Sequence, residues 1–312
     1  MIKSIKRVKK NPWVLWIWNE RRRIKGKKEY NKISDEEFVK QFYKNAFGKD
    51  LNLENPITFN EKLNWLKLNY KNKVATKCAD KYEVRQYIED KGYGYILNEL
   101  IGVYESVDDI DINKIPNKCV LKATHGSGWN LIVKDKNNLN WTAWKLVMKS
   151  WLNQNFYYYG REWVYKDMKP RIICEKYLED SNQELLDYKL YCFNGIPKFI
   201  QIDVDRFTNH TANYYDTEWN EMPFQYDDEN SGRVIEKPKN LDKMLDIAKV
   251  LSKEFEHVRV DFYEVDGRLY FGELTFFTAS GTGKFNPEEY DEKVGEWLEL
   301  KDIASNLKES RF

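Results

Sequence analysis

The segment 258–276 constrains this chain most, because it has the pattern of a β-hairpin that carries its charges on one face only. Runs of β-branched and aromatic residues flank Asp266-Gly267, a dipeptide typical of tight hairpin turns. We expect a three-residue loop over 265–267, with the glycine in the left-handed conformation. That loop length predicts that Arg259 lies opposite Glu273 in the paired strands.

The side-chain period of two then divides the hairpin into a core face and a face that carries the chemistry. The residues expected on the chemical face are Arg259, Asp261, Phe271, Glu273 and Thr275, and those on the core face are Val258, Val260, Phe262, Tyr270 and Leu274. A two-residue loop would separate Asp261 from Glu273, so this prediction depends on the loop. Carboxylates placed in this way either form surface ion pairs or hold a hard cation such as Mg²⁺, with phosphate as the other ligand.

The composition is that of a globular protein with one multi-lobed unit or two domains. A chain of 312 residues with 42% hydrophobic content can bury a sizeable core. The four cysteines have no close pair spacing, which favours buried free thiols and a reducing compartment. The three histidines are not spaced to share one metal, so a histidine-based zinc site is not expected.

The N-terminal arm, residues 1–34, differs in charge from the rest of the chain. Residues 1–28 carry eleven Lys and Arg against one acid, a net +10, whereas the remainder carries 40 basic and 49 acidic residues, a net −9. The run 12–18 holds three tryptophans between basic flanks, which is typical of a membrane-surface anchor but too short to span a bilayer. We expect a cytoplasmic protein that contacts the anionic inner face of the membrane. The alternative is an arm that packs on its own acidic domain, and nucleic acid is not an expected partner.

Helical and strand patterns along the rest of the chain predict an α+β fold. From Ser34 to about Glu89, apolar residues recur at helical spacing, so this stretch is expected to be mostly helical. Strands are expected in part of 96–104 and at 119–122, 131–134, 172–177, 188–193 and 199–204. A helix over 240–255 is expected to pack behind the hairpin.

Several further segments have features of a nucleotide site. The loop Gly126-Ser127-Gly128 joins two predicted strands next to Lys122, so its backbone N–H groups could bind phosphate; the alternative is an ordinary hairpin loop. Asp80-Lys81 begins an amphipathic helix ahead of this loop. Taken alone, these residues are typical of a solvent-exposed helix face. The backbone groups at the strand end 175–178 could hydrogen-bond the edge of an adenine ring. The alternative is that this segment is an ordinary strand end. A second flexible loop, 279–283, follows the hairpin directly.

In this order the motifs resemble the ATP-grasp superfamily, and over residues 57–300 they resemble its teichuronopeptide-biosynthesis, TupA-like branch. The motifs that carry the second resemblance are Phe59-Asn-Glu-Lys-Leu63, Lys122-Ala-Thr-His-Gly-Ser-Gly128, Asp187-Tyr-Lys189, Cys192-Phe-Asn-Gly195 and Phe271-Gly-Glu-Leu-Thr-Phe276. The resemblance implies two α+β lobes that clasp ATP, with an atypical helical N-terminal region. With the arm at 1–34, the expected divisions are a helical region at 35–115, a small lobe at 116–178 and a large lobe with the metal site at 179–312.

The resemblance also implies an activity in which ATP phosphorylates a carboxylate and an amine attacks the acyl phosphate. The implied ATP-binding residues are Lys81, Lys122, Gly126, Ser127, Gly128, Glu175, Tyr177 and Leu178, with Asp187 for the ribose. Lys189 and Arg259 are implied to act at the phosphates and the charged intermediate. The implied Mg²⁺ ligands are Asp261, Glu273 and Thr275, the last in place of the asparagine of many relatives. Such a transfer needs charge screening and no protein nucleophile.

The implied biological role is cell-surface polysaccharide or teichuronopeptide-like assembly, in which a uronic acid is amidated with an amino acid. A second hypothesis is a glycosyltransferase of capsular polysaccharide synthesis, because Asp203-Val204-Asp205 has the form of a metal- and sugar-nucleotide-binding motif. It leaves Lys122, its loop and Glu273 unexplained. A third is a catalytically inactive carbohydrate-binding or scaffolding protein, against which the presence of both Asp261 and Glu273 argues.

Overall fold

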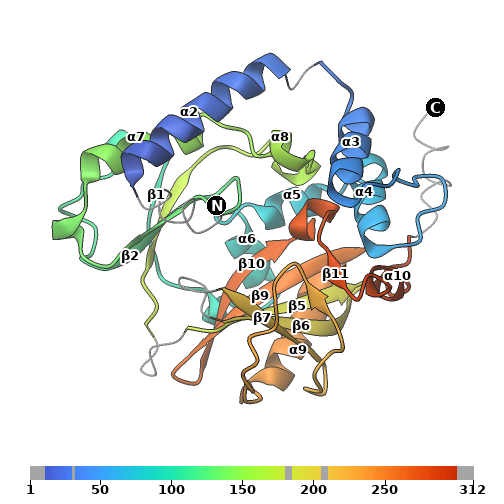
Figure 1. Cartoon of the computed structure of the whole chain (residues 1–312). Helices are drawn as coiled ribbons and strands as arrows, with labels where there is room; N and C mark the ends of the chain where they lie inside the picture. The colour runs from blue at the N-terminus through green and yellow to red at the C-terminus, as the bar shows by residue number, and fades with distance from the viewer. Residues whose placement is uncertain (1–10, 30–31, 180–184, 205–209, 301–312) are drawn as a thin grey trace. The chain divides into compact units, whose positions relative to one another are not determined.

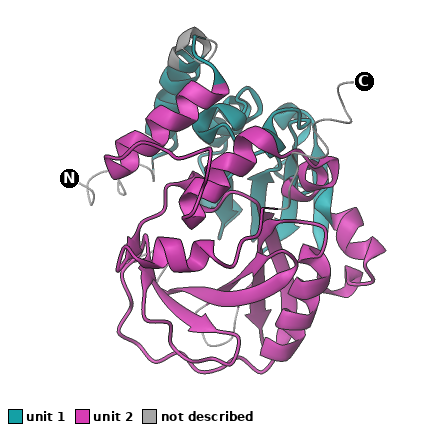
Figure 2. Cartoon of the chain, turned by 90° about the vertical axis from the view of Figure 1, so that its right-hand side faces the viewer, with its two compact units in different colours: residues 1–34, 80–84, 98–177 teal, residues 35–79, 85–97, 178–312 magenta. Residues whose placement is uncertain are grey.

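The computed structural model describes residues 11–29, 32–179, 185–204 and 210–300. The chain divides into two compact units, which Figure 2 shows in teal and magenta. Unit 1 contains residues 1–34, 80–84 and 98–177, and unit 2 contains residues 35–79, 85–97 and 178–312. Each unit is therefore built from stretches that are separated in the sequence. The division into four consecutive segments stays a prediction.

Unit 1 is built on an antiparallel sheet with the strand order β1-β4-β2-β3. Its strands are β1 Leu100–Tyr104, β2 Cys119–Ala123, β3 Asn130–Val133 and β4 Ile172–Lys176, and its helices are α2 Pro12–Glu29, α7 Trp141–Leu152 and α8 Tyr157–Gly160. Helices α2 and α7 lie side by side (Figure 1). The core of the unit joins side chains of β2, β3 and β4 to Val147, Met148 and Trp151 of α7.

Unit 2 contains a second antiparallel sheet, with the order β10-β9-β5-β6-β7. Its strands are β5 Asp187–Phe193, β6 Ile196–Val204, β7 Thr211–Asp216, β9 His257–Val265 and β10 Arg268–Thr275, and a two-stranded sheet pairs β8 Gln225–Tyr226 with β11 Phe285–Asn286. Its helices are α3 Asp35–Phe47, α4 Phe59–Asn69, α5 Lys73–Ala79, α9 Leu241–Ser252 and α10 Tyr290–Gly295; α6 Val84–Asp90 begins at the last residue of a unit 1 stretch.

Local sequence accounts for the main helices. At the start of α4, Thr58 and Glu61 form a capping box that satisfies backbone N–H groups of the first turn. The predicted helix over 240–255 is confirmed as α9, whose buried stripe packs against β9, β5 and β6. The predicted helical stretch is confirmed as α3 to α6, and the predicted strands correspond to β1 to β6 within a few residues.

The large sheet separates an apolar face from a charged face, as the hairpin pattern predicts. Leu190 of β5 pairs with Val260 of β9 and Ile200 of β6, and all three are fully buried. Cys192, two residues along on the same face, is also fully buried, and α9 packs against β9, β5 and β6 of this sheet. The intervening side chains of β5 point to the opposite face.

The four cysteines are free and buried, as expected. Burial raises the pKa of the Cys192 thiol to about 12, so this group stays protonated near neutral pH. In the part of the chain that the structure describes, no helix combines the length and the apolar character needed to cross a bilayer.

Candidate active site

The β9–β10 hairpin has a shorter loop than the sequence predicts. Val265 pairs with Arg268, so the loop is the two residues Asp266-Gly267, which have φ values of 49° and 76°. Positive φ at both positions is what a type I′ turn requires, and this turn follows the right-handed twist of the strands. The predicted three-residue loop, with Arg259 opposite Glu273, is therefore wrong.

A β-bulge further along the hairpin returns the acidic residues to one face. Phe271 pairs with Phe262, but Leu274 pairs with Val260, so Gly272 and Glu273 together lie opposite Asp261. The extra residue shifts the alternation by one position. Thr275 consequently pairs with Arg259, and Glu273 shares the face of Asp261.

Two aromatic residues before the bulge lie on the opposite faces from those predicted. Phe271 shares the core face with its partner Phe262, and Tyr270 lies beside Tyr263 on the charged side. The predicted chemical face is thus correct for its charged and hydroxyl members and wrong for these two aromatic residues.

Gly272 is the residue that permits the bulge. A Cβ atom built at this position would lie 3.0 Å from the carbonyl oxygen of Asp261 and 3.2 Å from its carbonyl carbon. Backbone atoms cannot move away from such a contact as the end of a flexible side chain can. The glycine therefore brings β10 close to β9 where the two acidic residues meet.

The side chain of Arg259 gathers the three predicted metal ligands. Its Nη2 atom lies 2.6 Å from Asp261 Oδ2, 3.1 Å from Thr275 Oγ1 and 3.6 Å from Glu273 Oε1, and its Nε donates to Asp261 Oδ1 at 2.7 Å. The Asp261 side chain is 3% exposed and that of Glu273 is 32% exposed. Oxygen atoms of two carboxylates and a hydroxyl thus surround one cationic nitrogen, and oxygen is the ligand type that Mg²⁺ takes.

The electrostatics of this group reflect its burial. Loss of hydration raises the pKa of Asp261 to about 7, although the adjacent Arg259 acts in the opposite direction. In the described part of the chain no set of three or more His, Cys, Asp or Glu side chains is arranged to hold a metal by itself. The donor set fits an ion that takes its remaining ligands from phosphate or water.

Neighbouring strands place two further predicted residues on the same face. Lys189 of β5 pairs directly with Asp261 of β9, and Asp187 lies two residues before it on the same side of the sheet. The Lys189 ammonium forms a short ion pair with Asp203 of β6 and lies 3.7 Å from Asp187 Oδ2. The structure therefore brings together Asp187, Lys189, Arg259, Asp261, Glu273 and Thr275 within unit 2.

One acidic residue of this cluster, Asp203, was not assigned to it from sequence. Asp203 accepts a hydrogen bond from Gln201 at 2.9 Å and lies 3.3 Å from His210, in addition to its pairing with Lys189. Asp205, the second acid of the Asp-x-Asp motif, lies outside the described residues. The signal that could have found the pairing is the register of β5 and β6, which aligns Asp187 with Asp203.

Unit 1 holds the predicted lysines next to the glycine-rich loop. Lys122 of β2 forms a 2.7 Å ion pair with Glu175 of β4, because the two strands are antiparallel neighbours. The ammonium of Lys81 donates to the carbonyl oxygen of Gly126 at 2.8 Å. The side chain of Glu175 thus binds Lys122. This contact was not predicted, because only backbone groups of the segment 175–178 were assigned a role from the sequence.

The loop itself is a hairpin connection between β2 and β3, where Lys122 pairs with Asn130. A Cβ atom at Gly126 would lie 2.7 Å from the Trp129 ring, so this glycine is packed against an aromatic side chain. Gly128 has a φ of 71° and open space around its Cα. Ser127 lies between them and is exposed.

The predicted adenine-binding segment follows β4. The chain passes from unit 1 to unit 2 between Tyr177 and Leu178, and both residues are partly buried. The carbonyl oxygen of Lys176 accepts a hydrogen bond from Asn98 Nδ2 at 2.8 Å.

A left-handed turn lies a few residues after the end of β10. Ala279, Ser280 and Gly281 have φ values of 44°, 52° and 64°, a conformation that costs a non-glycine residue roughly 1–2 kcal/mol. Three buried polar side chains of α4 donate to carbonyl oxygens of this turn or the residues just after it. They are Asn60 to Gly283 at 2.8 Å, Asn64 to Gly281 at 2.7 Å and Lys67 to Ser280 at 2.7 Å.

These contacts predict the effect of replacing Lys67 by methionine. The change removes the donor from the partly buried carbonyl group of Ser280, and we expect the free energy of unfolding to fall by about 1–3 kcal/mol. We also expect faster hydrogen exchange in a peptide that covers 277–284, measured by mass spectrometry. Lys62→Met is the matched control, because Lys62 lies on the same helix but donates to the carbonyls of Gly295 and Leu298. Equal exchange of this peptide in both variants would contradict the assignment.

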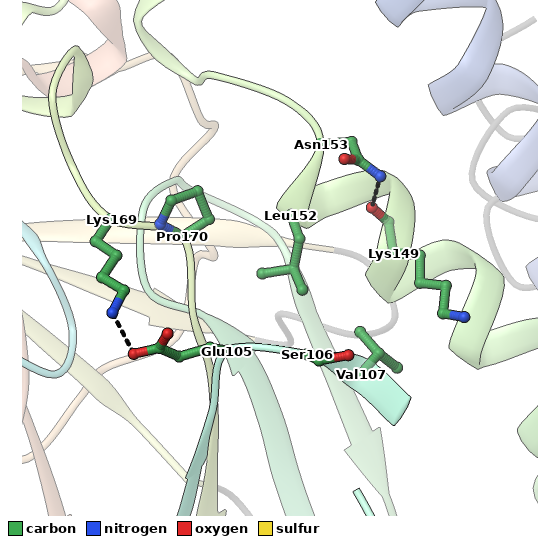
Figure 3. Close-up of a pocket in the computed structure, with 8 residues that line it drawn as sticks. All are labelled: Glu105, Ser106, Val107, Lys149, Leu152, Asn153, Lys169 and Pro170. Atoms are coloured by element: carbon green, nitrogen blue, oxygen red, sulfur yellow. Dashed lines mark hydrogen bonds and ion pairs between the residues drawn. The ribbon is translucent and has the colours of Figure 1, made fainter. Parts of the chain in front are cut away.

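A shallow cavity of about 400 Å³ lies elsewhere in unit 1. Its lining residues are Glu105, Ser106, Val107, Lys149, Leu152, Asn153, Lys169 and Pro170 (Figure 3). Lys169 forms an ion pair with Glu105, and Asn153 donates to the carbonyl of Lys149. None of the predicted site residues lines this cavity.

Comparison with known proteins gives one family match and several structural similarities. The family described as TupA-like ATP-grasp matches residues 61–299. Among solved structures, the chain is similar to D-alanine–D-alanine ligase from Bacillus anthracis, with 20% identity, a TM-score of 0.38 and coverage of 64% of this chain and 57% of the other. For an L-amino acid ligase from Bacillus licheniformis the corresponding values are 15%, 0.43, 82% and 56%.

The chain also resembles phosphoribosylamine–glycine ligase from Thermotoga maritima, with 14% identity, a TM-score of 0.39 and coverage of 65% of this chain and 48% of the other. It therefore spans less than two thirds of the length of these solved chains. No curated protein matches it. Because the family match covers most of the chain, this protein belongs to the TupA-like ATP-grasp family.

Proposed function

We propose that the protein is an ATP- and Mg²⁺-dependent carboxylate–amine ligase. The observation that carries the proposal is the arrangement of Asp261, Glu273 and Thr275 around the guanidinium of Arg259. A bulge at a glycine is needed to build it, and membership of the ATP-grasp family supports it. Asp261, Glu273 and Thr275 would hold Mg²⁺, which would neutralise charge on the phosphate oxygens.

The reaction consists of a phosphoryl transfer to the substrate carboxylate, followed by an acyl transfer to the amine. A carboxylate oxygen attacks the γ-phosphorus of ATP and the bond to the β–γ bridging oxygen breaks, which gives an acyl phosphate and ADP. The amine nitrogen then forms a bond to the acyl carbon, phosphate leaves, and the nitrogen loses a proton. In this proposal Lys81 and Lys122 contact ATP phosphates, while Lys189 and Arg259 stabilise the charge that develops in unit 2.

The remaining nucleotide contacts belong to the same proposal. The 126–128 loop covers the phosphates with its backbone N–H groups, and Glu175, Tyr177 and Leu178 form the adenine site, with Asp187 at the ribose. Lys122 is held in place by Glu175, so the lysine is already oriented before a nucleotide binds.

We further propose that the acid substrate is a uronic acid, free or within a polysaccharide, and that the amine is an amino acid. The protein would act in the cytoplasm in the synthesis of a capsule or a teichuronopeptide-like polymer, at the inner face of the membrane. The resemblance of the motifs to the TupA-like branch supports this substrate class, and the basic arm supports the location. The glycosyltransferase hypothesis is less well supported, because the chain belongs to the TupA-like ATP-grasp family and the Asp203 motif gives no role to Lys122, its loop or Glu273.

Calorimetric titration with a non-hydrolysable ATP analogue tests the nucleotide site. We expect binding that strengthens at least about tenfold when Mg²⁺ is present, because the ion links phosphate to the acidic residues. UDP-glucose, which carries no carboxylate, is titrated in parallel with Mg²⁺ and is expected to give no binding. Binding of the UDP-sugar alone would remove the ligase proposal. A positive result justifies a screen of uronic acids with amino acids for ADP release.

A further inference from the structure

Helix α2 has two faces with different surroundings. Leu15 and Trp16 pack against the core of unit 1, and Asn19 is buried and donates to Ser150 of α7 at 3.0 Å. Gly26, about two turns further along on the same face, is also buried. One face of the helix is therefore fixed to its own protein, through apolar packing and one neutral hydrogen bond.

The opposite face of α2 is apolar and exposed. Trp13, Val14, Ile17, Trp18 and Ile24 have exposed fractions of 41%, 39%, 45%, 50% and 51%. At about 100° of rotation per residue, these side chains and Arg21 fall within one continuous arc, which is separate from the arc that holds Leu15, Trp16 and Asn19. The exposed apolar side chains thus form a stripe, which we call the α2 outer face.

The charge around the α2 outer face selects its partner. Arg21 and Arg22 are exposed, and the Arg22 guanidinium stacks 3.7 Å from the Tyr159 ring and 5.0 Å from the Trp18 ring. Residues 1–28 carry a net charge of +10. Tryptophan rings together with arginine are typical of the level of lipid headgroups, where the ring enters the interface and the guanidinium meets phosphate.

We infer that the α2 outer face binds the surface of an anionic phospholipid bilayer, with the helix lying in the plane of the interface. This inference deepens the proposed location at the membrane, because it names the contact face and makes unit 1 the part that carries it. The helix is held by Asn19 and the core, so it docks as a fixed part of unit 1. Leu15 and Trp16 are partly buried against the core of unit 1, on the side of the helix turned away from the proposed lipid contact.

Co-sedimentation of the full-length protein with vesicles tests this inference. We expect binding to vesicles of equal parts phosphatidylglycerol and phosphatidylcholine, no measurable binding to phosphatidylcholine alone, and release at high salt. The double variant Ile17→Ser/Ile24→Ser is expected to bind anionic vesicles at least about tenfold more weakly. Arg21→Glu is expected to weaken binding as well, through its charge.

Ile196→Ser is the matched control, because Ile196 is exposed to the same fraction as Ile24, 51%, but lies on β6 of unit 2. It should bind vesicles like the unaltered protein. Unchanged vesicle binding by the double variant would overturn the inference. Equal binding of the unaltered protein to phosphatidylcholine vesicles would do the same. So would a double variant that no longer self-associates but still binds vesicles normally, because the α2 outer face would then be a contact between copies of the chain. Circular dichroism confirms that the variants are folded.

The same variants separate this inference from the proposed chemistry. Because the α2 outer face includes none of the predicted nucleotide ligands, the double variant should bind the ATP analogue with Mg²⁺ as the unaltered protein does. If vesicle binding follows the predictions while the analogue fails to bind to any of the proteins, the ligase proposal falls and the membrane face remains.

Discussion

Replacing Glu273 by glutamine is expected to lower turnover by roughly 100- to 1,000-fold, the size of effect seen when one charge-stabilising group is removed from an active site. The amide keeps the shape of the side chain but removes the negative charge from the more accessible of the two proposed carboxylate ligands, with 32% of the Glu273 side chain exposed against 3% for Asp261. Asp261→Asn is expected to have a similar effect on turnover. ADP release with the substrate pair found by the screen is the measurement.

A matched control lies on the same hairpin. Asp266→Asn makes the identical change of carboxylate to amide, and asparagine accepts the φ of 49° at this turn. We expect Asp266→Asn to retain near-normal turnover and Mg²⁺-dependent binding of the ATP analogue. Normal turnover in both Glu273→Gln and Asp261→Asn would refute the proposed metal site, whereas equal loss in all three variants would indicate damage to the hairpin as a whole.

The elements of this fold that were predicted well are those with a strong local pattern. Helix α9 has a buried stripe at helical spacing, and β9 and β10 flank a turn dipeptide. Strand β7 was not predicted. Its central residues 212–215 are all buried, so no alternation of apolar and polar residues marks the strand.

The structure places Asp187, Lys189, Arg259, Asp261 and Glu273 on one face of the sheet. Their roles at a nucleotide and metal site stay predictions. The pairing of Lys189 with Asp203 was not foreseen, because it depends on the register between two strands and not on local spacing.

The contacts of α4 also could not be predicted from local sequence, because they join residues that are far apart in the chain. Its Asn60, Asn64 and Lys67 bind a turn more than 200 residues further along the chain. Polar residues at these helical positions have the same local pattern as a solvent-exposed face, and only the tertiary structure shows that they are buried.

The hairpin loop shows why a correct conclusion can follow from a wrong step. Asp-Gly suits both a two-residue loop and a longer one, so the dipeptide alone does not fix the register. The bulge at Gly272 supplies the missing residue in the middle of β10. A glycine inside a predicted strand was the available signal, since such a glycine often marks a bulge or a close backbone approach.

The bulge leads to the second prediction, for Gly272→Val. A Cβ atom here would lie 3.0 Å from a backbone oxygen of Asp261, so we expect β10 to move away from β9 at this point. Overpacking of this kind typically costs about 1–3 kcal/mol of folding stability. Displacement of Glu273 by about 1 Å is expected to lower turnover by roughly 100-fold. Denaturant unfolding measures the loss of stability, and ADP release measures the loss of turnover. Gly272→Ala should lie between Gly272→Val and the unaltered protein in both measurements.

Gly94→Ala separates the geometric effect from a general cost of adding a methyl group. A Cβ atom at Gly94 would lie 3.2 Å from Glu89 Cγ, an atom of a flexible side chain that can move, so we expect turnover to stay normal. If Gly272→Val kept normal turnover, the position of Glu273 would not depend on the bulge. Loss of turnover without loss of Mg²⁺-dependent ATP-analogue binding would instead place the bulge's role at the acid or amine substrate. We expect Gly272→Val to lose turnover and Mg²⁺-dependent binding of the ATP analogue together, because Gly272 sets the approach of the two strands that carry the proposed Mg²⁺ ligands.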